Sequence, residues 1–111
     1  IVGVIVLAVA EALVLAANAG ANSIKVQRTL MDGAASSTTL QNHGSRMLAG
    51  EFEPGFRAEL QQNDLRVVLS AARDLGVVLP LAATAEGLYN ALTARGRAKE
   101  DHSAIVTIPE E

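Results

Sequence analysis

The first twenty residues, IVGVIVLAVAEALVLAANAG, form an almost unbroken apolar run that contains one charged residue, Glu11. A helix that is apolar on all sides must be buried in a protein core or in a membrane. A membrane span needs about 20 apolar residues, and a charge near its centre costs roughly 2.5–3.5 kcal/mol. The Ala-Asn-Ala segment at 17–19 resembles a signal-peptide cleavage site, but no basic segment precedes it. We therefore favour a buried helix that ends at Gly20, with a signal peptide and a membrane helix as the alternatives.

The composition fits one helical domain that binds neither nucleic acid nor metal. The 111 residues leave room for one core, which must consist mainly of aliphatic side chains because only 3% of residues are aromatic. The net charge is −3 and no basic run occurs, so we expect no nucleic-acid partner. The absence of cysteine excludes disulfides and thiolate chemistry. His43 and His102 are far apart in the sequence, so we expect no metal site.

Capping and turn residues divide the rest of the chain into helices. Asn22 and Ser37 are typical N-caps, Gly50 and Gly76 are typical C-terminal residues, and Pro80 is typical of a first helical turn. No segment shows a convincing strand pattern. We predict an all-α fold of about five to six helices, the later ones over roughly 23–32, 38–48, 57–75, 80–95 and 103–108.

The helix predicted over 57–75 carries an apolar stripe that we expect to face the core. Asp64 lies in the middle of this stripe, so we expect its carboxylate to be buried or half-buried with a partner. It either caps a neighbouring helix or pairs with an arginine, or it borders a functional site. Glu11 raises the same question in the first helix, where we expect a structural hydrogen bond. The stripe consists of Leu60, Val67, Val68, Ala71 and Leu75.

Several segments resemble the β-hydroxyacid dehydrogenases, the family of 2-hydroxy-3-oxopropionate (tartronate semialdehyde) reductase and 3-hydroxyisobutyrate dehydrogenase. The run Pro-Gly-Phe-Arg at 54–57, then Leu60 and Asn-Asp-Leu at 63–65, is similar to the family's F-x-x-x-L-x-x-K-D-L segment. The stretches at 11–13, 33–38, 79–81 and 101–104 agree with the family in the same order. The resemblance covers the whole chain, and the reductase branch is the most similar.

The resemblance implies a helical bundle like the C-terminal domain of 6-phosphogluconate dehydrogenase, here a single domain over 1–111. In the family an N-terminal Rossmann domain binds NAD or NADP, and no G-x-G-x-x-G fingerprint for it occurs in this chain. The family's catalytic lysine would fall a few residues before Ile1. We therefore expect a fragment that has no catalytic residue, binds no cofactor by itself and is inactive. The parent would be a cytoplasmic, non-membrane enzyme for a small hydroxyacid.

The resemblance also places three residues at the cofactor: Phe56, Asn63 and Asp64. Asn63 stands where the family has a lysine, which replaces a cation by a neutral amide and puts the parent's activity in question. The alternative is a non-catalytic helical interaction domain derived from this family. In the family's last motif, Asp101 is expected to act as the N-cap of the final helix.

The resemblance implies two partners for this domain, its own Rossmann domain and a further copy of the chain. Without the Rossmann domain, the apolar surface of the first helix would need another cover. We therefore expect a homo-oligomer in which this helix contacts a second copy. The residues expected to need cover are Val2, Val6, Val9 and Leu13.

Overall fold

The computed structural model describes residues 1–110, and in this range the protein is entirely helical. No strand occurs among these residues; one isolated antiparallel bridge joins Arg57 and Asp101. The predicted all-α fold is therefore confirmed. The six helices are α1 (Val2–Asn18), α2 (Ser23–Met31), α3 (Thr38–Ala49), α4 (Ala58–Leu75), α5 (Pro80–Ala94) and the 3₁₀ helix η1 (His102–Thr107).

The helix ends lie where the local sequence predicts them. The side chain of Asn22 accepts a hydrogen bond from Lys25 N at 3.1 Å, and Ser37 Oγ accepts one from Leu40 N at 2.9 Å. Gly50 and Gly76 follow α3 and α4 with φ of 67° and 70°. This left-handed conformation is open to glycine and costly for other residues, so the two glycines end their helices.

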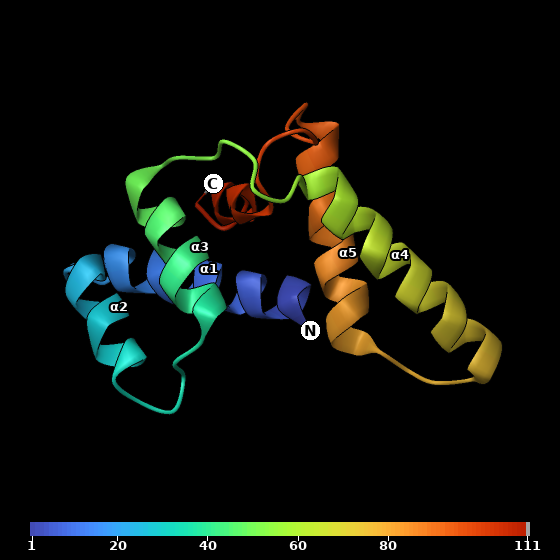
Figure 1. Cartoon of the computed structure of the whole chain (residues 1–111), viewed down its shortest axis with the longest axis horizontal. Helices are drawn as coiled ribbons and strands as arrows, with labels where there is room; N and C mark the ends of the chain where they lie inside the picture. The colour runs from blue at the N-terminus through green and yellow to red at the C-terminus, as the bar shows by residue number, and fades with distance from the viewer. Residues whose placement is uncertain (111) are drawn as a thin grey trace.

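Helix α1 is the central element of the molecule (Figure 1). Its neighbours are α2 and α3 toward one end of the molecule and α5 and η1 toward the other, while α4 packs against α5 as an outer hairpin. Val6 and Ala10 have no exposed surface, and Leu13 is 3% exposed. This confirms the interpretation of the apolar run as a buried helix of a folded domain. No helix among residues 1–110 is both long and apolar enough to cross a membrane.

The burial of α1 corrects two expectations. Val6, Val9 and Leu13 are covered by the chain itself, and of the four residues expected to need a cover only Val2 is exposed, at 46%. The premise that α1 offers an extensive uncovered surface is therefore wrong, because helices on both sides enclose it. Glu11 is exposed, so water solvates its carboxylate and the expected structural hydrogen bond is not needed.

The apolar stripe on α4 does not face the core, contrary to the prediction. Leu60, Val67 and Val68 are 47%, 59% and 47% exposed, and Asp64 is exposed as well, so its expected burial is also wrong. The main packing partners of α4 are α5 and η1, Gln61 and Leu65 also lie against Gly3 of α1, and the rest of the α4–α5 hairpin extends away from α1 (Figure 1). The buried positions of α4 therefore lie on another face: Ala58, Gln61, Leu65 and Ala72.

The exposed stripe is called the α4 apolar face below, and it comprises Leu60, Val67, Val68, Ala71 and Leu75. Nothing within residues 1–110 covers it. Further exposed apolar residues continue it at the tip of the hairpin, namely Val77, Val78 and Leu81.

Candidate functional site

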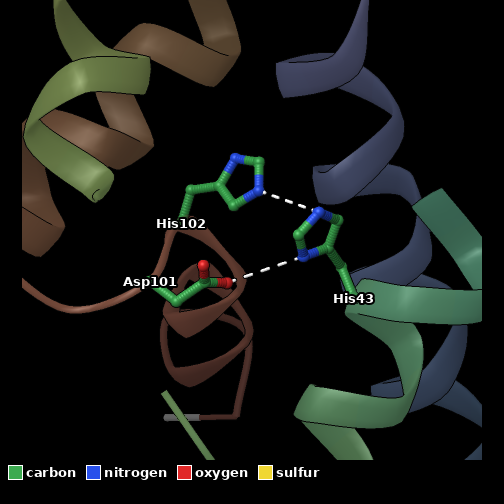
Figure 2. Close-up of side chains that lie close together, drawn as sticks. All are labelled: His43, Asp101 and His102. Atoms are coloured by element: carbon green, nitrogen blue, oxygen red, sulfur yellow. Dashed lines mark hydrogen bonds and ion pairs between the residues drawn. The ribbon is translucent and has the colours of Figure 1, made fainter. Parts of the chain in front are cut away.

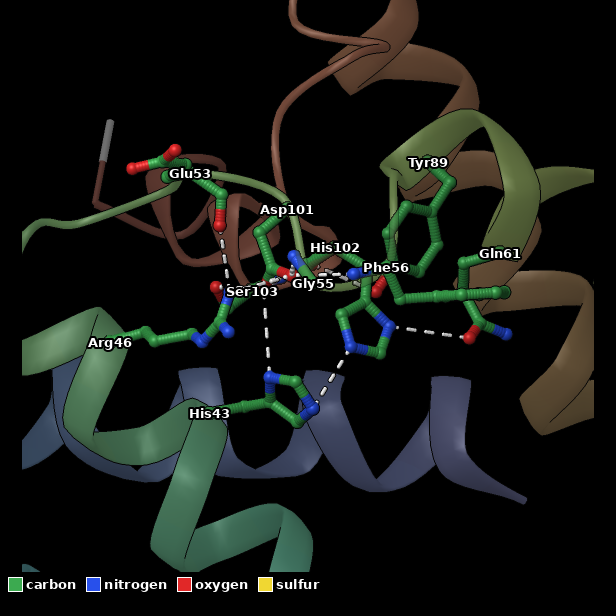
Figure 3. A network of polar contacts seen from close by, with 10 residues as sticks. All are labelled: His43, Arg46, Glu53, Gly55, Phe56, Gln61, Tyr89, Asp101, His102 and Ser103. Carbon is green, nitrogen blue, oxygen red and sulfur yellow. Dashed lines mark hydrogen bonds and ion pairs between the residues drawn. The ribbon is translucent and has the colours of Figure 1, made fainter.

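The carboxylate of Asp101 is the centre of a buried polar cluster between α3, the loop before α4 and the start of η1 (Figure 3). Its side chain has no exposed surface and pairs with the guanidinium of Arg46 at 2.9 Å. Oδ1 accepts hydrogen bonds from the backbone N–H groups of Gly55 and Phe56, each at 3.0 Å. Oδ2 accepts from the N–H of Ser103 at 3.0 Å and from its hydroxyl. The predicted N-cap role is therefore confirmed, and Asp101 also holds two more segments of the chain.

The electrostatics of Asp101 follow from these donors. Burial would raise the pKa of its carboxyl, but the hydrogen bonds from Ser103, Phe56 and Gly55 outweigh burial and lower the pKa to about 2. The side chain is therefore a carboxylate at neutral pH.

Backbone hydrogen bonds fix the loop 52–57 against the segment 98–102. Asp101 N donates to Phe52 O and His102 N donates to Phe56 O, both at 2.8 Å. Ala58 N and Glu59 N, the first donors of α4, bond to the carbonyls of Glu100 and Ala98. This explains how α4 begins at Ala58 without a side-chain cap, because a neighbouring segment supplies the acceptors.

Two histidines complete the cluster (Figure 2). His43 Nε2 lies 3.1 Å from His102 Nε2, and the two rings are nearly perpendicular, at 88°. His102 Nδ1 lies 3.3 Å from Gln61 Oε1. His43 Nδ1 lies 3.5 Å from Asp101 Oδ2 and is buried without a hydrogen bond. The two histidines, which are far apart in the sequence, therefore lie side by side in the fold.

Both histidines are neutral at pH 7. Burial lowers the pKa of His102 to about 4, and the neighbouring His43 and Arg46 act in the same direction. Burial also lowers the pKa of His43, although Asp101 partly opposes it. Tyr89 on α5 has no exposed surface and donates its hydroxyl to His102 O at 3.1 Å, which ties α5 to the cluster.

The three residues predicted at the cofactor differ in burial. Phe56 is half-buried and meets the His102 ring edge-to-face at 5.2 Å. Asn63 and Asp64 lie on the exposed side of α4. The side chain of Asn63 accepts a hydrogen bond from Arg66 Nη2 at 2.6 Å. A cationic group therefore stands one turn along the helix from the position where the resemblance expects lysine.

The sequence interpretation missed His43, Arg46 and Gln61 as members of the cluster. Their spacing contained a partial signal, because residues 43 and 46 are three apart and share one face of α3. His43 and Arg46 both lie against Asp101, which is more than fifty residues further along the chain. Only the packing of η1 against α3 brings these three residues together.

Comparisons with known proteins agree on one kind of relative. A family model described as "NAD-binding of NADP-dependent 3-hydroxyisobutyrate dehydrogenase" matches residues 1–108. The chain is 46% identical over 99 residues to 2-hydroxy-3-oxopropionate reductase of Escherichia coli K12, which is 89% of this chain and 34% of that protein. It is 32% identical over 106 residues to L-threonate dehydrogenase of the same strain, 96% of this chain and 35% of that protein.

Solved structures give the same result. The structure of 3-hydroxyisobutyrate dehydrogenase from Salmonella typhimurium matches with a TM-score of 0.92 at 32% identity, over 96% of this chain and 38% of that chain. Mycobacterium tuberculosis 3-hydroxyisobutyrate dehydrogenase matches with a TM-score of 0.87 at 24% identity, over 98% of this chain and 40% of that chain, and shows the shared fold. The chain spans about a third of the length of the curated relatives that it matches.

Proposed function

This chain belongs to the NAD(P)-dependent β-hydroxyacid dehydrogenase family as its C-terminal helical domain, and on that premise we propose that it forms one wall of the active-site cleft of such an enzyme. The other wall would be an N-terminal Rossmann domain. The match of the family model over nearly the whole chain carries the proposal. The degree of identity to the reductase favours a small 2-hydroxy-3-oxo acid as the substrate class.

In the whole enzyme, the nicotinamide cofactor would exchange a hydride with the carbinol carbon of the substrate. A lysine outside this chain would transfer the hydroxyl proton. The chain itself would contribute binding and orientation, so the isolated domain would not turn over substrate.

The loop 52–57 would position Phe56 at the cofactor. The support for this assignment is that Asp101 holds Phe56 through its backbone N–H while His102 holds its ring. Such fixation on both sides lowers the entropy lost when a ligand binds. Asp101 is thus proposed as a positioning residue that touches neither cofactor nor substrate.

Asn63 and Asp64 would face the cleft from α4, and their exposure leaves them free to contact a second domain. Asn63 is a neutral amide, but its partner Arg66 carries a permanent charge. We therefore propose that Arg66 supplies the cation that attracts the cofactor phosphate or the substrate carboxylate. This would allow the parent enzyme to remain active although Asn63 stands where the family has a lysine.

The α4 apolar face would be covered in the assembled protein by the Rossmann domain or by a second copy of the chain. Exposed large apolar residues concentrate there and at the tip of the hairpin, whereas Val6, Val9 and Leu13 of α1 are already buried. We therefore expect the oligomer interface on α4, and not on α1 as the sequence suggested.

The test uses the full-length protein that carries this domain. We expect it to oxidise NADH or NADPH in the presence of 2-hydroxy-3-oxopropionate, followed by nicotinamide absorbance, and the isolated chain to show no turnover. A full-length protein that is folded and binds neither cofactor would favour the non-catalytic interaction domain instead. Turnover by the isolated chain, with contaminating enzymes excluded, would refute the assignment of the chemistry to the proposed Rossmann domain.

A further inference from the structure

We propose that His43 and His102 together bind one divalent transition-metal ion through their Nε2 atoms, while their Nδ1–H groups donate to Asp101 and Gln61. The ion would bridge α3 and η1 at the centre of the domain. The site shares His102 and Asp101 with the residues that hold Phe56, but the binding of an ion there does not require the proposed dehydrogenase activity.

The count of protons in the cluster motivates the proposal. Three contacts run in a row, from Gln61 Oε1 to His102, from His102 to His43, and from His43 to the Asp101 carboxylate. Each contact needs one hydrogen, but two neutral imidazoles carry only two N–H groups. With the amide of Gln61 oriented as it stands, one contact always lacks its hydrogen. In the structure, His43 Nδ1 is the atom for which no hydrogen is left, because it is buried and makes no hydrogen bond.

A metal ion removes the deficit completely. If both rings carry their hydrogen on Nδ1, His43 donates to Asp101 Oδ2 and His102 donates to Gln61 Oε1. The two Nε2 lone pairs then face each other and are both available to one ion. Metal-binding histidines usually donate their other ring N–H to a carboxylate or carbonyl in this way.

The distance between the nitrogens suits this arrangement. Imidazole nitrogens lie about 2.0–2.1 Å from Zn²⁺, which places two ligands of one tetrahedral or octahedral ion roughly 3.0–3.4 Å apart. The Nε2 atoms of His43 and His102 are 3.1 Å apart. The ion would lie to the side of the line between them, so each ring would have to turn until its Nε2 lone pair points at the ion.

Charge and access are compatible with a cation. Arg46 is the nearest positive group, and Asp101 neutralises it at 2.9 Å. The His43 side chain is 19% exposed and His102 is buried, so an ion and its water ligands would have to enter from the His43 side. Two imidazoles favour Zn²⁺, Ni²⁺, Cu²⁺ or Co²⁺ over Mg²⁺ or Ca²⁺, which prefer oxygen ligands.

A bound proton or a reoriented Gln61 amide could also supply the missing hydrogen, and the experiment must distinguish these from a metal. The chain, free of any histidine tag and treated with a chelator, is titrated with Zn²⁺ at pH 7 by calorimetry and with Co²⁺ by visible absorption. We expect saturation at one ion per chain. The chain has only two histidines and no cysteine, so competing nitrogen or sulfur sites are few.

Two variants test the ligands. His43→Ala should abolish saturable binding, and the partial exposure of this side chain, 19%, favours a folded product. Gln61→Met should weaken binding about 10–100-fold, because it removes the acceptor for His102 Nδ1–H. Asp74→Asn, which changes an exposed carboxylate near the end of α4, is the matched control and should bind as the unaltered chain does.

NMR of the imidazole nitrogens gives a readout that does not depend on variants. We expect both rings to carry hydrogen on Nδ1 and both Nε2 signals to shift when Zn²⁺ is added. Absence of saturable binding, equal binding by His43→Ala, or Nε2 signals that respond to pH alone would each overturn the proposal.

Discussion

The Asp101→Asn substitution tests whether one buried carboxylate holds the loop 52–57, α3 and η1 together. Asparagine has nearly the same shape, so the change removes the charge and replaces one acceptor oxygen by an N–H donor. If the remaining oxygen keeps Gly55 and Phe56, the new donor faces Ser103 N–H, which is buried and loses its acceptor.

The expected cost follows from these contacts. A hydrogen bond to a charged group contributes about 1.5–3 kcal/mol. The ion pair with Arg46 adds less, about 1 kcal/mol, because the arginine side chain is 35% exposed and regains water. The same hydrogen bonds lower the pKa of Asp101 to about 2, which corresponds to a preference of the fold for the carboxylate over the neutral acid of roughly 2–3 kcal/mol. We therefore expect the free energy of unfolding to fall by about 3–4 kcal/mol.

Thermal and urea unfolding of the chain, followed by circular dichroism, measure this loss. For a domain of this size the expected change in Tm is roughly 10–20 °C. Hydrogen exchange should accelerate most at Gly55, Phe56 and Ser103, whose N–H groups lose a charged acceptor. Asp64→Asn makes the same chemical change at an exposed site and should alter stability by less than about 0.5 kcal/mol. If the two variants unfold at the same temperature, Asp101 does not hold the cluster together.

The remaining predictions concern α4. Leu65→Ala should lower the free energy of unfolding by about 2–4 kcal/mol, whereas Leu60→Ala should cost less than about 1 kcal/mol, and equal losses in urea unfolding would contradict the assigned buried face. Val67→Glu should leave the Tm of the isolated chain nearly unchanged but weaken assembly of the full-length protein, as sedimentation would show; an intact assembly would place the interface elsewhere. In the full-length enzyme, Arg66→Ala should raise KM for the cofactor or the acid about tenfold or more, since a charge-assisted bond contributes about 1.5–3 kcal/mol. Adding Asn63→Lys should restore KM, and failure of both changes to affect KM would show that this turn does not face the cleft.

Local chemistry made the helix ends predictable. The caps at Asn22, Ser37 and Asp101 bond to N–H groups two or three residues away, so the relevant partners are all within one short segment. Gly50 and Gly76 act through their own backbone conformation. Such interactions require no knowledge of the tertiary fold.

The face of α4 could not be assigned in this way. An apolar stripe indicates that another part of the protein or a partner packs against that face of the helix, but it does not identify which one. Within residues 1–110 the core uses Leu65 and the small Ala58 and Ala72, where α5 and η1 approach. The larger residues of the α4 apolar face remain exposed, which is typical of a surface that binds another protein surface.

The sequence by itself determined that this chain is an all-helical domain, where its helices begin and end, and that its motifs resemble the β-hydroxyacid dehydrogenases. Only the tertiary structure decided that His43, Arg46 and Asp101 form one buried cluster. The physical reason is the range of the interactions. Caps and turns act between near neighbours in the chain, whereas a buried ion pair and two facing imidazoles depend on where α3 and η1 pack across α1.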